Sequence, residues 1–212
     1  MLNPIRAVVL DYGNVLCRRP KPDEFETLYR LSGIAPQRFQ ECFWRYRRDY
    51  DRGTLEGPAY WRKVAEDASV ILTDEQIAQL IGADVELWQE RDPVMWRWVE
   101  TLRTNGLKTA VLSNMPREVA NSLRRAPSWL EGFDCVVLSS DFGSLKPEPK
   151  IYQICLDKLQ VRAEEALFID DHAENVEGAR ALGMYAVQFE SPTQLAAALA
   201  PFHLPTLQLA AS

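Results

Sequence analysis

The sequence is poor in histidine and cysteine, and these scarcities exclude several kinds of functional site. His172 and His203 are the two histidines among 212 residues, so a histidine-rich metal centre or a serine–histidine–aspartate triad has little material. The four cysteines form no closely spaced C-x-x-C pair of the kind that binds metals. We therefore expect reduced thiols in a cytoplasmic protein.

A surplus of positive charge is also absent. With 24 Lys and Arg against 30 Asp and Glu, the net charge is −6, which argues against broad nucleic-acid binding through phosphate contacts. A small anionic substrate is not excluded, because one site can be locally positive. No apolar stretch approaches the length of a membrane span, and the opening segment MLNPIRAVVLDYG does not resemble a signal peptide. We expect a monomer or homodimer that binds neither membrane nor nucleic acid.

From residue 91 onward, segments typical of strands and helices alternate. The sequence predicts strands at residues 5–11, 107–114, 133–140, 164–170 and 184–189. Between the later strands it predicts helices at residues 93–106, 116–126, 148–160 and 173–183. This alternation is typical of βαβ units, and so of a parallel sheet covered by helices on both faces.

Residues 18–90 interrupt the alternation. They contain no convincing strand, and their periodicity predicts helices at 23–33, 36–50, 57–68 and 73–89, separated by Gly, Pro, Ser or Thr. The predicted fold class is therefore α/β, with a Rossmann-like core of residues 1–17 and 91–212 and an inserted α-helical cap of residues 18–90. The proline-containing tail from residue 201 is expected to pack on the surface or to fray.

Polar residues stand at or shortly beyond the ends of several predicted strands, where open parallel sheets bind ligands. These signals are Asp11, Ser113-Asn114, Lys146 and Asp170-Asp171. Each alone has a structural explanation. An aspartate can close a turn, a Ser-Asn pair can begin a helix, a lysine is commonly a solvated charge, and paired acids favour a helix N-terminus. Their combination indicates one site.

In this order, the segments LDYGNVL, VLSN, LKPEPKIY and FIDDHAENVEGARALG resemble the motifs of the haloacid dehalogenase-like hydrolase superfamily. The resemblance covers nearly the whole chain, including a helical cap inserted after the first motif. The segments are most similar to those of the capped phosphatases, and some sugar-phosphate phosphatases share the D-x-G-N-V opening. The resemblance implies hydrolysis of a small phosphorylated metabolite, such as a sugar phosphate, through an aspartyl-phosphate intermediate.

The resemblance also implies a nucleophile and a metal site. Asp11 is the expected nucleophile, and a carboxylate that attacks a phosphate needs a cation beside it. Mg²⁺ prefers oxygen ligands. The implied ligands are Asp11, the carbonyl group of Gly13, where glycine permits the backbone turn, and Asp171. Asp170 and Asn175 are expected behind them, acting through water or hydrogen bonds.

Three further groups are expected to bind the substrate's phosphoryl group. The Ser113 hydroxyl and the backbone N–H of Asn114 are the expected donors. Lys146 is expected to neutralise the nucleophile and the phosphate together. These assignments follow from the resemblance, and each suits the charge that phosphoryl transfer concentrates.

Gly13 departs from the phosphatase pattern. Most phosphatases of the superfamily have a second Asp two residues after the nucleophile, which protonates the leaving group and then activates water. The intact remaining motifs favour a working phosphatase in which Asn14, His172 or a cap residue substitutes. Two alternatives stay open: a weakly catalytic protein that binds a phosphate ligand or a partner, and a 2-haloacid dehalogenase. Dehalogenases also lack the second acid but need no metal, which makes the paired acids of the fourth motif unsuitable for them.

The segment FWRYRRDYDRG, residues 43–53, carries four arginines and several aromatic residues. It is either a solvated helix with Phe43 and Trp44 in the core of the cap, or a segment that contacts substrate. In the second interpretation Arg45 or Arg48 reaches a sugar or a second anionic group. Since lids select substrates by closing over a site, the cap is expected to set substrate choice.

Overall fold

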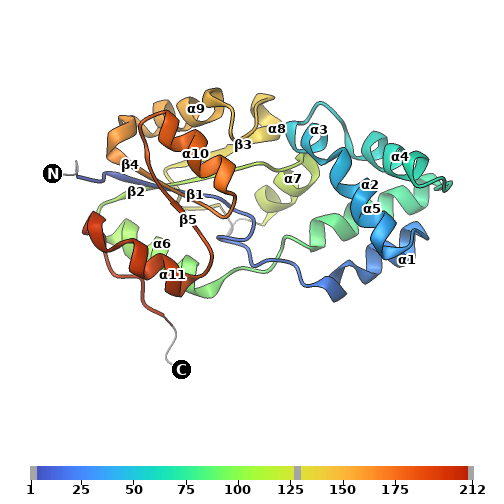
Figure 1. Ribbon diagram of the computed structural model, residues 1–212, viewed down its shortest axis with the longest axis horizontal. Coiled ribbons are helices and arrows are strands. Elements are labelled where there is room, and N and C mark those ends of the chain that lie inside the picture. The colour runs from blue at the N-terminus through green and yellow to red at the C-terminus, as the bar shows by residue number, and fades with distance from the viewer. Residues whose placement is uncertain (1–3, 127–129, 210–212) are drawn as a thin grey trace.

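A five-stranded parallel sheet forms the centre of the computed structural model, which describes residues 4–126 and 130–209. The strand order is β3-β2-β1-β4-β5, and the chain forms β1, β2 and β3 before crossing to the other side for β4 and β5 (Figure 1). The order therefore reverses at β1, the position where such sheets open a crevice. The strands are β1 Ala7–Leu10, β2 Lys108–Ser113, β3 Cys135–Leu138, β4 Ala166–Asp170 and β5 Tyr185–Gln188. The predicted α/β, Rossmann-like class is confirmed.

Helices cover both faces of the sheet, as expected for strands that are apolar on both sides. One face carries α6 Pro93–Thr104, α7 Arg117–Arg125 and α11 Pro192–Ala198, and the other carries α9 Pro149–Leu159 and α10 Ala173–Ala181 (Figure 1). Within β1, Val8 packs toward the first face and Val9 toward the second. The sheet thus has two apolar cores and leaves its ends for polar residues.

The helix boundaries follow ordinary capping chemistry. The Asp92 side chain accepts hydrogen bonds from Val94 N at 2.8 Å and Met95 N at 3.0 Å, and Pro93 occupies the first turn of α6. Ser191 accepts a bond from Gln194 N at 3.1 Å at the start of α11. The sequence analysis did not predict α11, although Ser191 followed by a proline was an available start signal.

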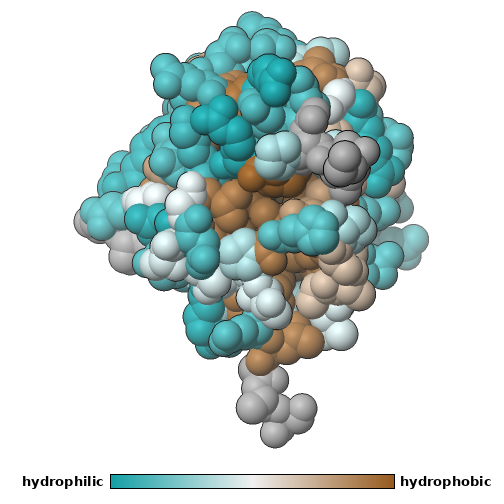
Figure 2. Space-filling model, turned by 90° about the vertical axis from the view of Figure 1, so that its left-hand side faces the viewer, coloured by the Kyte–Doolittle hydropathy of each residue, from teal (hydrophilic) through white to brown (hydrophobic). Residues whose placement is uncertain are grey.

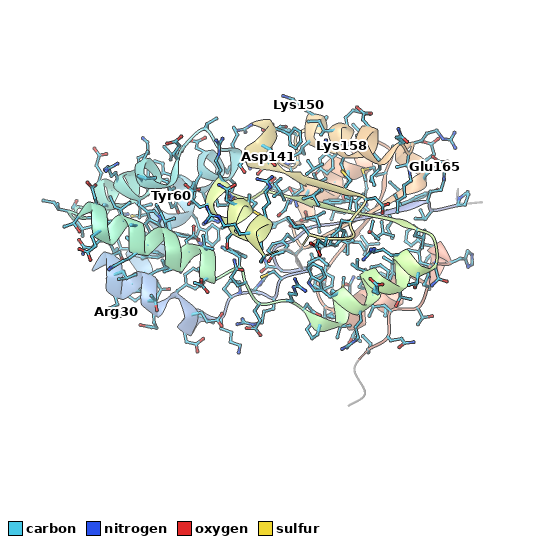
Figure 3. All side chains as sticks on the ribbon, turned by 180° about the vertical axis from the view of Figure 1, so that it is seen from behind. Arg30, Tyr60, Asp141, Lys150, Lys158 and Glu165 are labelled. Atoms are coloured by element: carbon cyan, nitrogen blue, oxygen red, sulfur yellow. The ribbon has the colours of Figure 1, made fainter. Side chains whose placement is uncertain are left out.

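Between β1 and α6 the chain forms a helical insertion with an aromatic core of its own. Its elements are η1 Pro22–Phe25, a 3₁₀ turn, and the helices α1 Glu26–Ser32, α2 Pro36–Arg45, α3 Arg47–Arg52, α4 Gly57–Asp67 and α5 Asp74–Glu86. Phe39, Phe43 and Trp61 are fully buried in this core. Tyr60 lies among these helices (Figure 3), and its hydroxyl donates to the Phe43 carbonyl oxygen at 2.6 Å.

Two predicted elements differ from the structure. The helix predicted over residues 36–50 is broken at Tyr46, whose φ of −105° and ψ of 3° leave the helical region, so α2 and α3 run separately. The strand predicted to residue 140 ends at Leu138, and Ser139–Phe142 form the short helix α8. Both differences matter below, because α3 lies beside α8 (Figure 1).

The C-terminal segment packs on the core as far as Leu207. Two short 3₁₀ turns complete the elements: η2 Ala163–Glu165 before β4, and η3 Ala200–Phe202 after α11. Beyond η3, Leu207 is buried, and Trp98 Nε1 donates to the Pro205 carbonyl oxygen at 2.9 Å. Figure 2 shows hydrophobic residues gathered at this end of the molecule, remote from the insertion. Among the described helices, none combines the length and apolar character that a membrane span needs.

Candidate active site

The carboxyl edge of the sheet carries the polar residues that the sequence analysis selected. Asp11 directly follows β1, and its backbone N–H donates to the Ile169 carbonyl oxygen of β4 at 2.9 Å. Ser113 is the last residue of β2, and Asp170 is the last residue of β4. A pocket of about 250 Å³ opens at this edge, and Asp11, Ser113, Lys146 and Asp171 line its floor.

Lys146 is a buried cation that lines this pocket from the core, with a residue exposure of 1%. Its Nζ lies 2.8 Å from Asp11 Oδ1 and 2.6 Å from Asp170 Oδ2. Asn114 holds the backbone of Lys146 from both sides: its Oδ1 accepts from Lys146 N at 2.8 Å, and its Nδ2 donates to the Lys146 carbonyl oxygen at 3.0 Å. The sequence analysis did not foresee this positioning role for the Asn114 side chain.

Asp170 is fixed behind the pocket by several donors. Asn175 Nδ2 donates to its two carboxylate oxygens at 3.0 and 3.1 Å, and the His172 backbone N–H donates to Oδ1 at 2.8 Å. Together with the Lys146 ion pair, these bonds leave the fully buried Asp170 side chain with a single orientation. Asp170 can therefore orient Lys146 and Asn175 at the edge of the pocket.

Asp171 is held by a residue that the sequence analysis considered only as a substitute acid. Asn14 Nδ2 donates to Asp171 Oδ2 at 2.9 Å, and Arg19 lies 3.3 Å from the same oxygen. The left-handed backbone conformation of this loop belongs to Asn14, with φ 58°, and not to Gly13. Glycine was expected to permit the backbone turn here; the residue with the left-handed conformation is Asn14, which tolerates it and also positions Asp171.

The site holds more negative than positive charge among its buried groups. Burial raises the pKa of Asp11 above its ordinary value; Lys146 lowers it, while Asp170 and Asp171 raise it further. Although burial acts against it, Lys146 and the bonds from Asn175 and His172 hold the pKa of Asp170 below its ordinary value. The single Lys146 ammonium group thus pairs with both Asp11 and Asp170, so a second cation can further stabilise the negative charge of Asp11.

The residues present fit a hard divalent cation. One carboxylate oxygen from each of Asp11, Asp170 and Asp171 lies within 4.8 Å of the others. Asp171 Oδ1 is buried and has no hydrogen-bond partner among the described residues. An all-oxygen set with an unpaired buried oxygen is the type of environment that Mg²⁺ occupies.

The helical insertion provides the opposite wall of the pocket, including residues that the sequence analysis missed. Arg47 of α3 is buried: its Nε donates to Asp51 Oδ1 at 2.9 Å, and its NH1 donates to the two oxygens of Asp84 at 2.9 and 3.0 Å. Its guanidinium carbon lies 5.9 Å from the centre of the Trp88 ring. Arg47, Asp51 and Trp88 all line the pocket. Nothing in the local sequence distinguishes Arg47 from the three neighbouring arginines.

The structure separates the two arginines that were expected to reach substrate. Arg48 lies in α3 and lines the pocket. Arg45 ends α2, on the other side of the break at Tyr46, and pairs with Asp67 at 2.7 Å outside the pocket. The expectation for Arg45 is corrected by this placement. Trp44, which one interpretation placed in the core of the insertion, is 48% exposed and also lines the pocket.

The structure describes the two named residues that were expected to substitute for the acid absent at Gly13. A Cβ atom at this position would lie 3.4 Å from Cζ3 of Trp88, so the tryptophan ring covers the glycine. The Asn14 amide is engaged by Asp171. The His172 ring is 63% exposed, with Nε2 3.8 Å from Asp171 Oδ1. Both residues line the pocket, but an amide is not an effective general acid, and the His172 ring is largely open to solvent.

Comparisons with known proteins agree on one family. A sequence model of the haloacid dehalogenase-like hydrolases matches residues 5–183. The chain is 40% identical over 190 residues to Phosphatase MT3486 of Mycobacterium tuberculosis, covering 86% of each protein. It is 28% identical over 199 residues to (S)-2-haloacid dehalogenase 1 of a Pseudomonas strain, covering 88% of this chain and 85% of that protein.

A longer relative and two solved structures extend these matches. Acyl-CoA dehydrogenase family member 10 of mouse is 33% identical over 159 residues, which are 75% of this chain but 13% of that protein. A predicted HAD-like family hydrolase from Porphyromonas gingivalis has a TM-score of 0.72 at 23% identity, covering 94% and 98% of the two chains. A HAD family enzyme from Bacteroides thetaiotaomicron, in complex with magnesium and inorganic phosphate, has a TM-score of 0.66 at 18% identity, covering 88% and 94%.

Proposed function

Because this chain belongs to the haloacid dehalogenase-like hydrolase family, we propose that it is a Mg²⁺-dependent phosphomonoesterase acting on a small phosphorylated metabolite, such as a sugar phosphate. The observation that carries the proposal is the pairing of Asp11 with Lys146 at 2.8 Å, beside the acidic cluster that Asp11 forms with Asp170 and Asp171. The match to a phosphatase over 86% of both chains supports the same chemistry.

In this mechanism Asp11 attacks the phosphorus atom of the bound ester. A carboxylate nucleophile divides hydrolysis into two displacements, with an aspartyl phosphate between them. Lys146 accompanies Asp11 throughout and offsets the charge on the phosphoryl oxygens, while the Ser113 hydroxyl and the Asn114 backbone N–H bind those oxygens. Asn114 and Asp170 keep Lys146 in place, so that the cation is positioned before the substrate arrives.

Asp11, the Gly13 carbonyl group and Asp171 are the residues that would hold Mg²⁺, with Asp170 and Asn175 behind them. When bound, the ion supplies charge stabilisation for the phosphoryl group and for the Asp11 nucleophile. Asn14 contributes by orienting Asp171 so that Oδ1 remains available. The magnesium and phosphate in a structural relative of the same fold are compatible with this assignment.

We further propose that residues 18–90 form a cap domain that selects the substrate. The insertion places Trp44, Arg47, Arg48 and Asp51 against the pocket, so a bound ester would meet aromatic surface and charged groups from this side. A volume of about 250 Å³ suits a compact leaving group.

The experiment that tests the proposed function compares the wild-type protein with Asp11→Asn on a panel of phosphate monoesters. We expect turnover with Mg²⁺, loss of turnover in EDTA, and loss of at least about 10³-fold in the variant, because the amide cannot act as the nucleophile. Activity that survives in Asp11→Asn contradicts the assignment of the nucleophile.

The same panel distinguishes the two other functions. The identity to (S)-2-haloacid dehalogenase 1 is a specific reason to include 2-haloacids. Dehalogenation in EDTA without phosphate hydrolysis would assign the protein to that activity. Binding of a phosphate mimic with Mg²⁺, without turnover of any ester, would instead indicate a binding protein.

A further inference from the structure

A phosphatase that cleaves alkyl esters needs a group that protonates the departing oxygen, because an alkoxide is a poor leaving group. A positioned general acid is typically worth about 10²–10⁴-fold in rate. Gly13 cannot supply one, an amide such as that of Asn14 is not an effective general acid, and the His172 ring is 63% exposed. The insertion wall of the pocket, however, contains a carboxyl group.

Asp51 is the carboxyl group that the insertion places in the pocket. It lies in α3, its side chain is 16% exposed, and it lines the same cavity as Asp11. Its Oδ1 accepts the bond from Arg47, whereas Oδ2 accepts no hydrogen bond from the described residues. The carboxyl group therefore has one oxygen that fixes it and one that remains available to a ligand.

The surroundings of Asp51 favour a shared proton. Arg47 is one cation between two acids, Asp51 and the fully buried Asp84, so the three groups carry an excess negative charge when all are ionised. The Tyr60 side chain of α4 also interacts electrostatically with these three groups. A proton on Asp51 relieves the excess charge.

Asp51 lines the same pocket as the reacting centre. Asp11 and Lys146 line it from the edge of the sheet, with Lys146 Nζ 2.8 Å from Asp11 Oδ1, and Asp51 lines it from the insertion. Lys146 also acts electrostatically on Asp51. An ester with its phosphorus atom beside Asp11 would therefore have its leaving group toward the insertion.

The backbone of Asp51 is tied to the core, so its position does not depend on the insertion alone. The Ser139 hydroxyl of α8 donates to the Asp51 carbonyl oxygen. The adjacent Arg52 bonds both oxygens of Glu148, at 2.5 and 3.0 Å. Gly53 lies against Ser140 so closely that a Cβ atom would come within 2.8 Å of its carbonyl oxygen. These contacts fix the end of α3 at the rim of the sheet.

We propose that Asp51 is the general acid and base of this enzyme, replacing the acid that Gly13 lacks; the inference rests on the proposed phosphatase function. In the first step, Asp11 Oδ forms a bond to phosphorus, the ester P–O bond breaks, and the Asp51 proton moves to the departing oxygen. In the second step, Asp51 takes a proton from water while the water oxygen bonds to phosphorus. The P–O bond to Asp11 then breaks, phosphate leaves, and Asp51 is protonated again.

The acid–base properties of Asp51 suit both steps. The pKa of Asp51 is raised to about 6, chiefly by burial and also by the charge of Asp84, although Arg47 and Lys146 act to lower it. Near neutral pH the carboxyl group therefore exchanges its proton at small cost. Because the acid form is needed in the first step, kcat for alkyl esters should fall as the pH rises through about 6.

The test compares Asp51→Asn with the wild type on an alkyl phosphate and on 4-nitrophenyl phosphate, with Asp49→Asn as the matched control. Asp49 lies on the same helix but is exposed and outside the pocket. We expect Asp51→Asn to lower kcat for the alkyl ester about 10²–10⁴-fold. The nitrophenyl ester, whose leaving group needs no proton, should give a burst of nitrophenol equal to the enzyme concentration, followed by slow turnover. Asp49→Asn should behave as the wild type.

The result that overturns the inference is an active wild type in which Asp51→Asn slows both esters equally and without a burst, or slows neither. The proposed function survives that result, whereas a wild type without any phosphatase activity removes both. In the Asp51→Asn background, Gly13→Asp should recover part of the alkyl-ester rate, since Gly13 has an ordinary φ and a Cβ atom there would be in ordinary contact with Trp88 at 3.4 Å. If Asp51→Asn fails to fold, Asp51→Glu decides: it should shift the alkaline limb of the alkyl-ester profile, and an unshifted limb assigns the acid to another group.

Discussion

Lys146 shows how much of the candidate site depends on single hydrogen bonds from distant residues. Asn114 fixes its backbone across 32 positions of sequence, and Asp170 fixes its ammonium group. Asn14 does the same for Asp171 across 157 positions. The side-chain amides of Asn114 and Asn14 are uncharged, but without them Lys146 and Asp171 would lose their orientation in the pocket.

Asp11, Ser113 and Asp171 could be selected from the sequence because each stands at or directly after a strand, and parallel strands bring these ends together. The residues of the insertion could not be selected in this way. Arg47 gains its role from Asp84, 37 positions away, and no periodicity in the helix distinguishes it from Arg45 or Arg48. Contacts between distant helices depend on packing, which local patterns do not encode.

Arg48 and Arg45 offer a matched pair for testing substrate contact by the insertion. Arg48→Gln should raise KM roughly two- to fivefold for a phosphate ester that bears a second anionic group, the range expected when an ion pair of about 0.5–1 kcal/mol is lost. It should change KM for 4-nitrophenyl phosphate little. Arg45→Gln should leave both values unchanged, because Arg45 pairs with Asp67 outside the pocket. Steady-state kinetics check this, and equal effects of the two variants would count against a contact at Arg48.

At the scale of elements, the break between α2 and α3 determines which residues reach the pocket. The hydrophobic periodicity of residues 36–50 predicted one helix, and the departure of Tyr46 from helical geometry turns α3 toward α8. No glycine or proline marks the break. Its physical reason is tertiary: α3 buries Arg47 against Asp84 and binds Ser139 and Glu148 of the core.

The buried Arg47 cluster should also stabilise the insertion. Arg47→Met leaves the fully buried Asp84 without its cation, a change that typically costs about 3–5 kcal/mol. Arg62→Met is the control, because the Arg62–Asp74 pair is exposed at 58% and 90% and such pairs contribute about 1 kcal/mol or less. Urea unfolding followed by tryptophan fluorescence measures both. Similar losses of stability in the two variants would show that the Arg47 cluster is not a structural anchor.

At the scale of the whole molecule, the strand order explains why one pocket can use residues from both ends of the chain. Alternating strands and helices after residue 91 predicted the parallel sheet, and the right-handed crossover rule restricts how such strands can be arranged. The pairing of β1 with both β2 and β4 then brings Asp11 between Ser113 and Asp170. The docking of the insertion was not predictable from these rules, since it depends on surface contacts such as Gly57 N to Glu118 Oε1 at 2.8 Å.

The proposed phosphatase and the alternative dehalogenase would both use Asp11 as the nucleophile, but the two reactions would differ in where water attacks. An ester of Asp11 with carbon is hydrolysed at the Asp11 carbonyl carbon, so a water oxygen enters the carboxylate. An aspartyl phosphate is attacked at phosphorus, so the water oxygen leaves with phosphate and the carboxylate keeps its own oxygens.

The most direct test of the account is therefore a reaction in H₂¹⁸O with Mg²⁺ and a phosphate monoester, with enzyme in excess over substrate. Mass spectrometry follows the released phosphate and the peptide that contains Asp11. The account predicts one ¹⁸O in each phosphate released and none in the Asp11 peptide. Label in the Asp11 carboxylate together with unlabelled phosphate would contradict it. Label in that carboxylate when the protein turns over a 2-haloacid, and not the phosphate ester, would also contradict it.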